Sequence, residues 1–429
     1  MPDAHNDLPG FTLSRRHLIA GAASGIALAA SGLPLAVNAS AIENTPVGNG
    51  ITPFRVKLDP SVIVDLRQRL TTVRWPDAGT TADWSQGVPL AKAKALTDYW
   101  RRQYDMTRLE KRLNAFPQFR TSIDGLGIHF IHVKSRHANA LPMILTHGWP
   151  GSVVEFLDTI DPLVNPTAHG GTVADAFHVV IPSMPGYGFS DKPTTAGWGL
   201  PRIAQAWDML MKRLGYAHYV AQGGDLGAGV ASWMSKQQPQ GLAAIHLNLP
   251  ILFPPPPPGA GGYTPAEQAA LNQLIHYGAD LSGYASIQGS RPQTLGYGLA
   301  DSPIGQAMWI YEKFQAWTDN RGDPADAIAV DKMLDNIMLY WVTDTAASSA
   351  RLYKESFNKD FVRFELAGPV AVSIFKGDIF TPPKSWGDQT YSKLTYWNEV
   401  PAGGHFAALE KPGSFVEELR KALKPYRLV

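Results

Sequence analysis

Short apolar runs alternate with helix-length segments from residue 123 onward, and this alternation constrains the fold more than any other feature. The apolar runs lie at 128–133, 141–146, 177–181, 219–221, 244–247, 370–375 and 394–397. Segments between them, such as 151–160 and 203–214, have the apolar spacing of helices. Strands that alternate with helices pair in parallel through crossovers, so the sequence predicts an α/β fold.

Two further regions are predicted to be helical. In residues 54–117, Asp59-Pro60 opens a segment whose apolar residues have helical spacing. Residues 265–358 show long helical patterns only, and they follow five consecutive prolines that fit neither a helix nor a central strand. We therefore expect an N-terminal helical region over residues 42–120. The α/β core should comprise residues 121–250 and 367–429, and a helical insertion with a proline-rich linker should separate its two parts over residues 251–366.

The first 41 residues resemble a twin-arginine export signal. Arg15-Arg16 precedes an uncharged, mildly apolar stretch that ends in Ala39-Ser40-Ala41, a small-x-small cleavage pattern. Glycine, serine and proline dilute this stretch too much for a good membrane span. We expect cleavage after Ala41 and a periplasmic or secreted protein without a membrane span in its mature form. The alternative is a membrane tether formed by an uncleaved signal.

Composition excludes several classes of function. Lys plus Arg is 38 and Asp plus Glu is 37, so the net charge of +1 gives no electrostatic footprint for nucleic acid. The absence of cysteine excludes disulfide scaffolds, thiol catalysis and Cys-ligated metals. Because His and carboxylate residues do not cluster at metal-binding spacing either, we expect no metal and no other cofactor. Oligomeric state is left open, a homo-oligomer included.

The segment Gln222–Gly227 carries the strongest chemical signal. It follows an apolar strand, precedes a helical pattern, and surrounds Asp225 with small residues, as in a nucleophile elbow. No Gly-x-Ser-x-Gly occurs in the chain, so a serine esterase is disfavoured. An aspartate in this position would attack as a carboxylate and form a covalent ester. A plain Gly-Gly-Asp turn or a helix N-cap is the alternative.

Three loops at predicted strand ends supply candidate partners. The loop His147–Ser152 follows one strand and would donate the Trp149 amide to an oxyanion hole, with the Leu226 amide as the second donor. His147 itself is expected to be structural. After the last two strands come Asp378 and His405, which suit an orienting acid and a general base. The order Asp225, Asp378, His405 is the nucleophile–acid–base order of serine hydrolases with this elbow.

In these motifs the chain resembles the microsomal-type epoxide hydrolases, a group that includes juvenile hormone epoxide hydrolases. The similarity covers nearly all of the chain after the signal and rests on Phe54-Arg55-Val56 with the helical region to Phe119, Ile123–Val133, His147–Ser152, Gly223-Gly224-Asp225, Ser282-Gly283-Tyr284, Asp301-Ser302-Pro303, Tyr353-Lys354-Glu355 and Gly403–Phe406. It implies an α/β-hydrolase core with an inserted helical lid and an N-terminal helical domain. It also implies that Tyr284 and Tyr353 are lid tyrosines that bind and protonate the epoxide oxygen.

The resemblance implies hydrolysis of a lipophilic epoxide to a vicinal diol, with water as the second substrate. Two positions depart from the family pattern. Leu226 replaces a frequent tryptophan, which affects the shape of the pocket, and Asp378 replaces the usual glutamate, which shortens the reach to His405.

Two other functions are compatible with an aspartate elbow. A haloalkane or haloacid dehalogenase forms the same ester, but its halide leaving group needs N–H donors, and here the candidates are two tyrosines. A catalytically inactive binding protein of the same fold would normally have lost one of Asp225, Asp378 and His405, yet all three are present. The natural epoxide, the regiochemistry and the enantioselectivity do not follow from the sequence.

Overall fold

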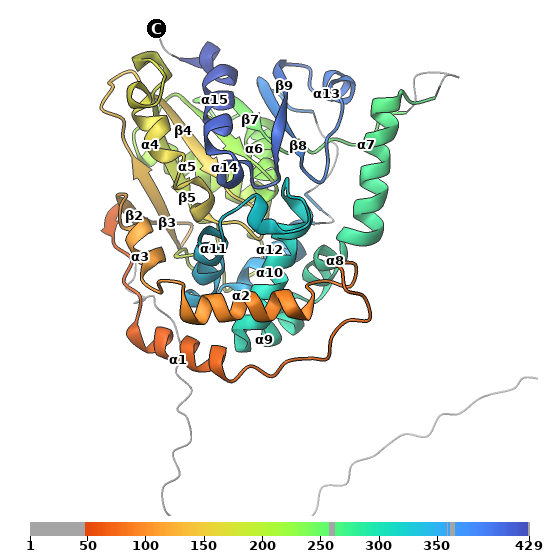
Figure 1. The fold of residues 1–429 in the computed structure, drawn as a ribbon. Coiled ribbons are helices and arrows are strands. Elements are labelled where there is room, and N and C mark those ends of the chain that lie inside the picture. The colour runs from red at the N-terminus through yellow and green to blue at the C-terminus, as the bar shows by residue number, and fades with distance from the viewer. Residues whose placement is uncertain (1–47, 257–261, 358, 361–364, 428–429) are drawn as a thin grey trace, which may run out of the picture. The chain divides into compact units, whose positions relative to one another are not determined.

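The computed structural model describes residues 48–256, 262–357, 359–360 and 365–427, and its central feature is a mixed sheet (Figure 1). The predicted signal, residues 1–41, and the end of the proline run lie outside these residues. Within them the strands are β1 (Thr52–Phe54), β2 (Gln118–Ile123), β3 (Leu126–Val133), β4 (Leu141–Thr146), β5 (Phe177–Pro182), β6 (Tyr219–Gly223), β7 (Leu242–Leu247), β8 (Val370–Gly377) and β9 (Leu394–Gly404). Their order across the sheet is β1-β2-β3-β5-β4-β6-β7-β8-β9.

The expectation of a parallel sheet is correct for one part of it and wrong for the other. All pairs from β5 to β9 are parallel. Strands β1, β2 and β3 pair antiparallel with one another, and β3 also pairs antiparallel with β5. The turn between β2 and β3 explains this, because Asp124 and Gly125 have φ of 52° and 78°, as two-residue hairpins require.

Helices cover both faces of the sheet. The core helices are α4 (Ile160–Val164), α5 (Leu200–Arg213), α6 (Leu226–Gln237), α13 (Lys384–Thr390), α14 (Ala407–Glu410) and α15 (Pro412–Ala422). Helices α5 and α6 contact each other on one face, and α4 contacts α15 on the other (Figure 1). Consequently the parallel strands are buried on both faces, which explains their continuous apolar sequences.

The N-terminal region is only partly helical. It contains α1 (Pro60–Thr71), α2 (Leu90–Arg102) and α3 (Arg108–Leu113). The predicted start of α1 is confirmed, since the Asp59 side chain caps it and Pro60 is its first residue. Residues 72–89, all of which the structure describes, form no helix, and β1 belongs to the sheet. Pro76, Gly79 and Gly87 interrupt that segment, so the prediction of helix over 54–117 is too broad.

A helical insertion separates β7 from β8, as predicted for the residues that the structure describes. It comprises α7 (Pro265–His276), one π-helical turn (Tyr277–Leu281), α8 (Gly283–Ser290), α9 (Pro292–Asp301), α10 (Pro303–Trp317), α11 (Val330–Val342) and α12 (Ala346–Ser356). Helices α1 and α2 lie against α10, so the N-terminal region packs on the insertion (Figure 1). No helix among the described residues is long and apolar enough to cross a membrane.

The predicted helix over 151–160 is wrong. A short 3-10 turn (Val153–Phe156) and the separate helix α4 occupy this part of the chain. Ser152 is the N-cap of the 3-10 turn and forms a capping box with Glu155. In this box each side chain accepts a hydrogen bond from the other residue's backbone N–H. An apolar pattern cannot distinguish such a turn followed by a second start from one continuous helix.

Strand register places the candidate residues at one edge of the sheet. Thr146 at the end of β4 pairs with Gly223 at the end of β6, so the loop from His147 and the turn at Asp225 leave the sheet side by side. Gly377 at the end of β8 likewise pairs with Gly404 at the end of β9. Residues at the carboxyl ends of adjacent parallel strands therefore meet there, the usual position of a site in an open α/β sheet.

Candidate active site

Asp225 occupies a sharp turn between β6 and α6. Its φ of 51° and ψ of −128° lie in a conformation that side chains rarely adopt. Neighbouring glycines make the turn feasible: a Cβ on Gly223 would lie 2.0 Å from the Gly227 carbonyl oxygen, and one on Gly227 would lie 2.0 Å from that of Thr146. The turn therefore projects the Asp225 carboxyl away from the sheet edge, as the nucleophile-elbow prediction requires.

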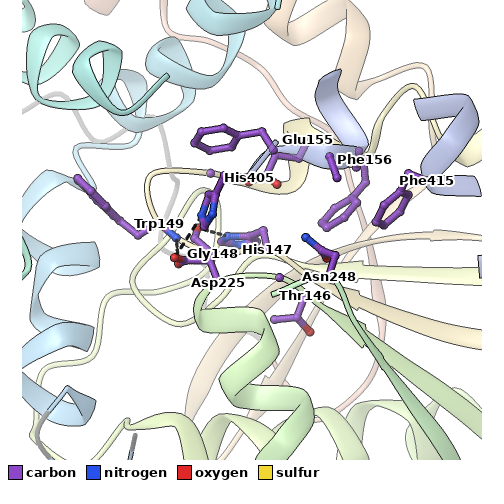
Figure 2. Close-up of a pocket in the computed structure, with 15 residues that line it drawn as sticks. Thr146, His147, Gly148, Trp149, Glu155, Phe156, Asp225, Asn248, His405 and Phe415 are labelled. Carbon is purple, nitrogen blue, oxygen red and sulfur yellow. Dashed lines mark hydrogen bonds and ion pairs between the residues drawn. The ribbon is translucent and has the colours of Figure 1, made fainter. Parts of the chain in front are cut away.

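One backbone amide contacts the Asp225 carboxyl, and a second directly follows Asp225 in the chain. The Trp149 N–H donates to Asp225 Oδ1 over 2.9 Å (Figure 2). Leu226 is the first residue of α6, where amide groups have no acceptor inside the helix. Gly148 permits the close approach, because a Cβ there would lie 2.3 Å from the side chain of Asp225. Both residues predicted for an oxyanion hole thus adjoin the candidate nucleophile.

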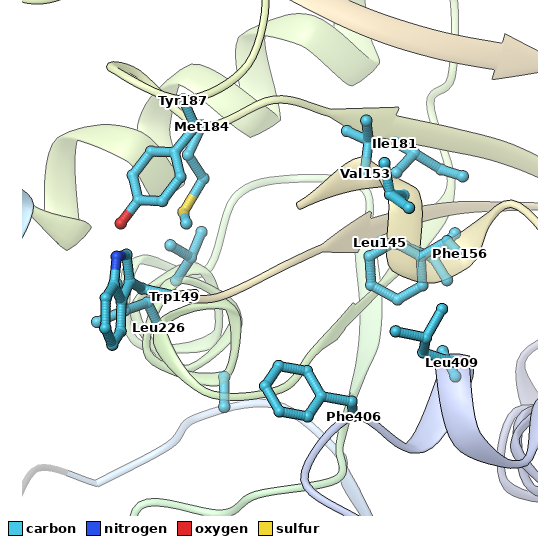
Figure 3. Packing of buried hydrophobic residues seen from close by; sticks show 14 of the residues in the cluster. Leu145, Trp149, Val153, Phe156, Ile181, Met184, Tyr187, Leu226, Phe406 and Leu409 are labelled. Carbon is cyan, nitrogen blue, oxygen red and sulfur yellow. The ribbon is translucent and has the colours of Figure 1, made fainter. Parts of the chain in front are cut away.

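Buried side chains fix the position of these amides. Figure 3 shows Trp149 and Leu226 among the buried apolar residues that also include Tyr187. His147 holds the loop, donating from Nδ1 to the Gly148 carbonyl over 2.9 Å and accepting at Nε2 from the Met184 N–H over 3.2 Å. Burial lowers the pKa of His147 to about 4, so the ring is neutral. This is the structural position that the sequence predicted for His147.

His405 connects the two candidate aspartates. Its Nε2 lies 3.4 Å from Asp225 Oδ2 (Figure 2), and its Nδ1 lies 2.9 Å from Asp378 Oδ1. The shorter aspartate side chain at 378 therefore reaches the imidazole. Burial alone would lower the pKa of His405, but the charges of Asp378 and Asp225 raise it well above its ordinary value. Asp378 lies 153 positions after Asp225 in the sequence, and His405 lies 27 positions after Asp378, yet the three side chains form one contiguous group.

The two predicted tyrosines come from the helical insertion and face the same site. Tyr284 of α8 stacks on the Trp149 ring, with centroids 4.9 Å apart, and Tyr353 of α12 meets both rings edge-on. The Tyr277 and Tyr284 hydroxyls lie 3.0 Å apart. Burial, reinforced by neighbouring phenols and the Asp225 charge, raises the pKa of Tyr284 and Tyr353 well above the usual value. Both hydroxyls consequently keep their protons at neutral pH.

A cavity of about 280 Å³ joins the insertion to the candidate nucleophile. Its walls are Asp225, Leu226, Leu249, Pro250, Ile251, Leu252, Phe253, Leu274, Tyr277, Tyr284, Tyr353, Phe357, Ile379 and Phe380. Apart from Asp225 and the tyrosines, these side chains are apolar. In the described part of the chain, no group of three or more His, Asp or Glu side chains is arranged to hold a metal ion.

Comparison with known proteins identifies the family. The family model "Epoxide hydrolase N terminus" matches residues 51–156, and "alpha/beta hydrolase fold" matches residues 142–273. The "Putative epoxide hydrolase" of Stigmatella aurantiaca (strain DW4/3-1) is 58% identical over 378 residues, which cover 88% of this chain and 86% of that protein. This chain belongs to the epoxide hydrolase family.

Other members of the epoxide hydrolase family agree with this assignment. Juvenile hormone epoxide hydrolase 1 of Ctenocephalides felis is 33% identical over 403 residues, covering 88% of this chain and 86% of that protein. The structure of Aspergillus niger epoxide hydrolase superposes with a TM-score of 0.79 at 31% identity, covering 89% of this chain and 98% of the other. The predicted resemblance and the α/β-hydrolase fold are thereby confirmed.

Three further residues near this candidate site were not predicted from the sequence. Glu155 and Asn248 line a second, small cavity beside Asp225 and His405. The Ser-x-x-Glu pattern of Ser152 and Glu155 is a capping-box signature and could have drawn attention to Glu155. Asn248 directly follows β7, a position that suits functional residues in parallel sheets. No local pattern indicated the buried Lys313, whose Nζ lies 4.6 Å from the Tyr284 ring centroid.

Proposed function

We propose that this epoxide hydrolase converts a lipophilic epoxide and water into a vicinal diol through a covalent ester on Asp225. One observation carries the proposal: the Asp225 carboxyl pairs with His405 and also lines the apolar cavity that contains Tyr284 and Tyr353. A nucleophile and two acids thus line one space of a size suited to a small organic molecule, and the base contacts the nucleophile from outside that space.

In the first step Asp225 attacks the epoxide. One carboxylate oxygen forms a bond to an epoxide carbon, while the carbon–oxygen bond of the strained ring breaks and its electron pair passes to the oxygen. The resulting alkoxide is a stronger base than a phenolate, so a tyrosine hydroxyl protonates it. Tyr284 and Tyr353 suit this role because both remain protonated until the alkoxide forms.

In the second step water breaks the ester. Ester formation removes the negative charge of Asp225, one of the charges that raise the pKa of His405, so His405 gives up its proton more readily. That proton returns, through solvent, to the tyrosine phenolate left by the first step, and the neutral imidazole is then a base. His405 then takes a proton from the water that attacks the ester carbonyl, while Asp378 holds the imidazole through Nδ1. When the tetrahedral intermediate collapses, the bond from the carbonyl carbon to the diol oxygen breaks and its electron pair passes to that oxygen. The imidazolium protonates this oxygen, which releases the diol, and the Asp225 carboxyl ionises again beside His405. The Trp149 and Leu226 amides would stabilise the oxyanion of the tetrahedral intermediate.

The helical insertion is proposed to act as a lid, and the N-terminal helical region as a domain that supports it. Supporting the first point, the large cavity is lined by residues of the core and of the insertion together. Supporting the second, α1 and α2 contact α10. The apolar walls favour a lipophilic substrate, because burying apolar surface is the main source of affinity in such a cavity.

Capture of the ester tests the mechanism. His405→Gln should still open an epoxide, because Asp225 needs no base for its attack, but it should stop after about one equivalent with the alkyl group on Asp225. Rapid quench followed by digestion and mass spectrometry would locate the adduct. Asp225→Ala serves as the control and should give neither a burst nor turnover.

Two results would contradict the mechanism. An adduct on a residue other than Asp225 would show that the nucleophile is misassigned. Full turnover by His405→Gln would show that water needs no help from this imidazole.

We also propose that residues 1–41 direct export, with cleavage after Ala41. The support comes from the sequence, namely the paired arginines and the small-x-small site. Replacing Arg15 and Arg16 with lysine should retain the precursor in the cytoplasm, which fractionation and immunoblotting would detect. Unchanged export of this variant would refute the proposal, and N-terminal sequencing of the exported protein would separate cleavage from tethering.

A further inference from the structure

The Asp225 carboxyl adjoins two different cavities. Besides the large apolar cavity, it lines a small one of about 20 Å³, together with Glu155, Asn248 and His405. Asp225 is the one residue that the two lining sets have in common, and the tyrosines line the large cavity alone. The two reactants could therefore approach Asp225 from separate spaces.

The small cavity has the size and the polarity that a single water molecule needs. A bound water requires a volume of about 10–15 Å³ or more and two to four polar partners. Here the volume is about 20 Å³, and the walls include the polar side chains of Asp225, His405, Glu155 and Asn248 (Figure 2). An epoxide that carries several carbon atoms is too large for this space.

The polypeptide fixes the Glu155 carboxyl in this position. Its Oε1 accepts from the Ser152 N–H over 3.1 Å, which leaves Oε2 for a second partner. The carboxyl also occupies the space of a side chain at Gly151, where a Cβ would lie 1.3 Å from Oε1. Glycine at 151 is thus required for Glu155 to fold back toward the catalytic residues.

A hydrogen bond also holds the side-chain amide of Asn248. Its Oδ1 accepts from Gln222 Nε2 over 2.7 Å, and this bond holds one side of the amide. The Nδ2 donor is consequently directed to the other side, and Figure 2 shows it turned toward the group that surrounds the cavity. The cavity therefore offers one acceptor from Glu155 and one donor from Asn248.

We propose that the small cavity binds the hydrolytic water, with Glu155 accepting a hydrogen bond from it and Asn248 donating one to it. This inference rests on the ester mechanism proposed above. A water that attacks an ester gives one proton to His405 and uses one lone pair to form the bond to carbon. Its second proton needs an acceptor and its second lone pair a donor, and Glu155 with Asn248 supplies both.

The electrostatics of Glu155 suit the second step. Loss of hydration raises the pKa of Glu155 to about 8, while His405 lowers it and the Asp225 charge raises it. Ester formation neutralises Asp225 and so removes one of the influences that keep Glu155 protonated. As the imidazole gains its positive charge it lowers the pKa of Glu155, and a carboxylate there would stabilise that charge in the transition state of hydrolysis.

Glu155→Gln separates this role from a structural one. The amide oxygen of glutamine can still accept from the Ser152 N–H, so the capping contact is retained, while an NH₂ group replaces the acceptor that faces the water. We expect ester formation within about threefold of the wild-type rate. Ester hydrolysis should slow by about 10- to 100-fold, as expected for a lost hydrogen bond to a charged group. The alkylated Asp225 should then accumulate during turnover.

Ser152→Ala is the matched control. It removes the hydroxyl of the same capping box, which accepts from the Val154 N–H over 3.2 Å, but leaves the Ser152 N–H and Glu155 in place. Both variants would be studied in single turnover by rapid quench and mass spectrometry. In the control, the ratio of the two rates should stay within about threefold of wild type.

Three outcomes would overturn the inference. These are unchanged ester hydrolysis in Glu155→Gln, equal slowing of both steps in that variant, and accumulation of the ester to the same extent in Ser152→Ala. In each of these cases an ester on Asp225 would still support the proposed function. Failure to capture any ester on Asp225, in His405→Gln as well, would instead refute the proposed function itself.

Discussion

The carboxyl of Asp225 is held by contacts on several sides rather than by its own backbone preference. A residue in such a conformation costs of the order of 1–3 kcal/mol and persists only where its surroundings determine it. Here those surroundings are the strand β6, the first turn of α6 and the hydrogen bond from the Trp149 amide. The same contacts aim the carboxyl at His405 and leave it accessible from the large cavity.

At the residue scale, the tyrosines are expected to affect the first chemical step selectively. Tyr284→Phe and Tyr353→Phe should each slow ester formation by tens to hundreds of fold, because the alkoxide loses a proton donor. Hydrolysis of an ester already formed should change much less. Single-turnover measurements of the two steps in each variant would test this assignment.

Tyr187→Phe is a suitable control for these variants. Tyr187 is also buried, but its hydroxyl donates to the Ser349 carbonyl over 3.2 Å and the residue does not line the large cavity. Its loss should leave the rate of ester formation nearly unchanged. Unaltered alkylation in both Tyr284→Phe and Tyr353→Phe would refute the assignment.

At the scale of elements, Gly227 determines how closely α6 approaches β4. A Cβ at this position would lie 2.0 Å from the Thr146 carbonyl oxygen, which belongs to the backbone and cannot move away cheaply. Gly227→Ala should therefore destabilise the protein by several kcal/mol, or about 1–3 kcal/mol if the helix shifts outward. Urea unfolding followed by circular dichroism would measure the loss.

Gly413→Ala provides the matched comparison. Gly413 lies in α15, and nothing lies within 4 Å of an added Cβ. Alanine should stabilise this helix by up to about 1 kcal/mol, since it has a higher helix propensity than glycine. Equal effects of the two substitutions would show that the close approach at Gly227 does not matter.

Asp335 of α11 joins the N-terminal region to the insertion. It is fully buried and accepts from Tyr104, Arg108 and Arg112, over 2.7, 3.1 and 2.8 Å. Asp335→Ala leaves the buried Tyr104 hydroxyl and the partly exposed Arg108 without this acceptor, while Arg112 keeps its pair with Asp158, so we expect a loss of about 1–3 kcal/mol in the free energy of unfolding. Asp301→Ala breaks an exposed pair with Arg69 and should cost no more than about 1 kcal/mol. Comparable losses in urea unfolding would contradict this difference.

The secondary structure of some elements could be predicted from their sequences, and that of others could not. Parallel strands such as β4 and β6 are buried on both faces, so their apolar runs are visible in the sequence. Pairing direction is not encoded in such a run, which is why the antiparallel part of the sheet was not foreseen. Residues 72–89 and 151–160 were predicted to be helical because the spacing of apolar residues does not show where prolines, glycines or a capping box end a helix.

At the scale of the whole molecule, the active site illustrates the same limit. Asp225, Asp378 and His405 could be predicted from the sequence as candidates because each follows a strand, and parallel strands bring their carboxyl ends together. Packing of distant elements alone brings Asn248 beside Asp225 and His405, and Lys313 beside the Tyr284 ring. Their contributions became visible with the cavities and contacts, since a single polar residue carries no pattern of its own.

Four buried histidines should make the stability of the whole molecule sensitive to acid. Burial lowers the pKa of His129 and His246 to about 3, and that of His132 and His147 to about 4. Each is neutral in the folded protein but takes up a proton in the unfolded chain below about pH 6.5. Their contribution to stability is therefore present above pH 6.5 and is lost as the pH falls toward 4 or 3. Glu155 and Glu410, with pKa values raised to about 8 and about 7, act in the opposite direction and lose their contribution as the pH rises.

Replacing one of these histidines isolates its share of the pH dependence. His246 lies in β7 with Nε2 3.0 Å from the Ser373 hydroxyl, and glutamine can keep one hydrogen bond there without titrating. Linkage predicts about 1.4 kcal/mol per pH unit for one histidine that is protonated in the unfolded state alone. His246→Gln is expected to lower the free energy of unfolding at pH 7.5 by some amount. Between pH 6.5 and pH 5, however, its free energy of unfolding should fall by roughly 2 kcal/mol less than that of the wild type. Urea unfolding of both proteins across this range measures the difference, and parallel pH profiles would show that His246 is protonated in the folded protein as readily as in the unfolded chain.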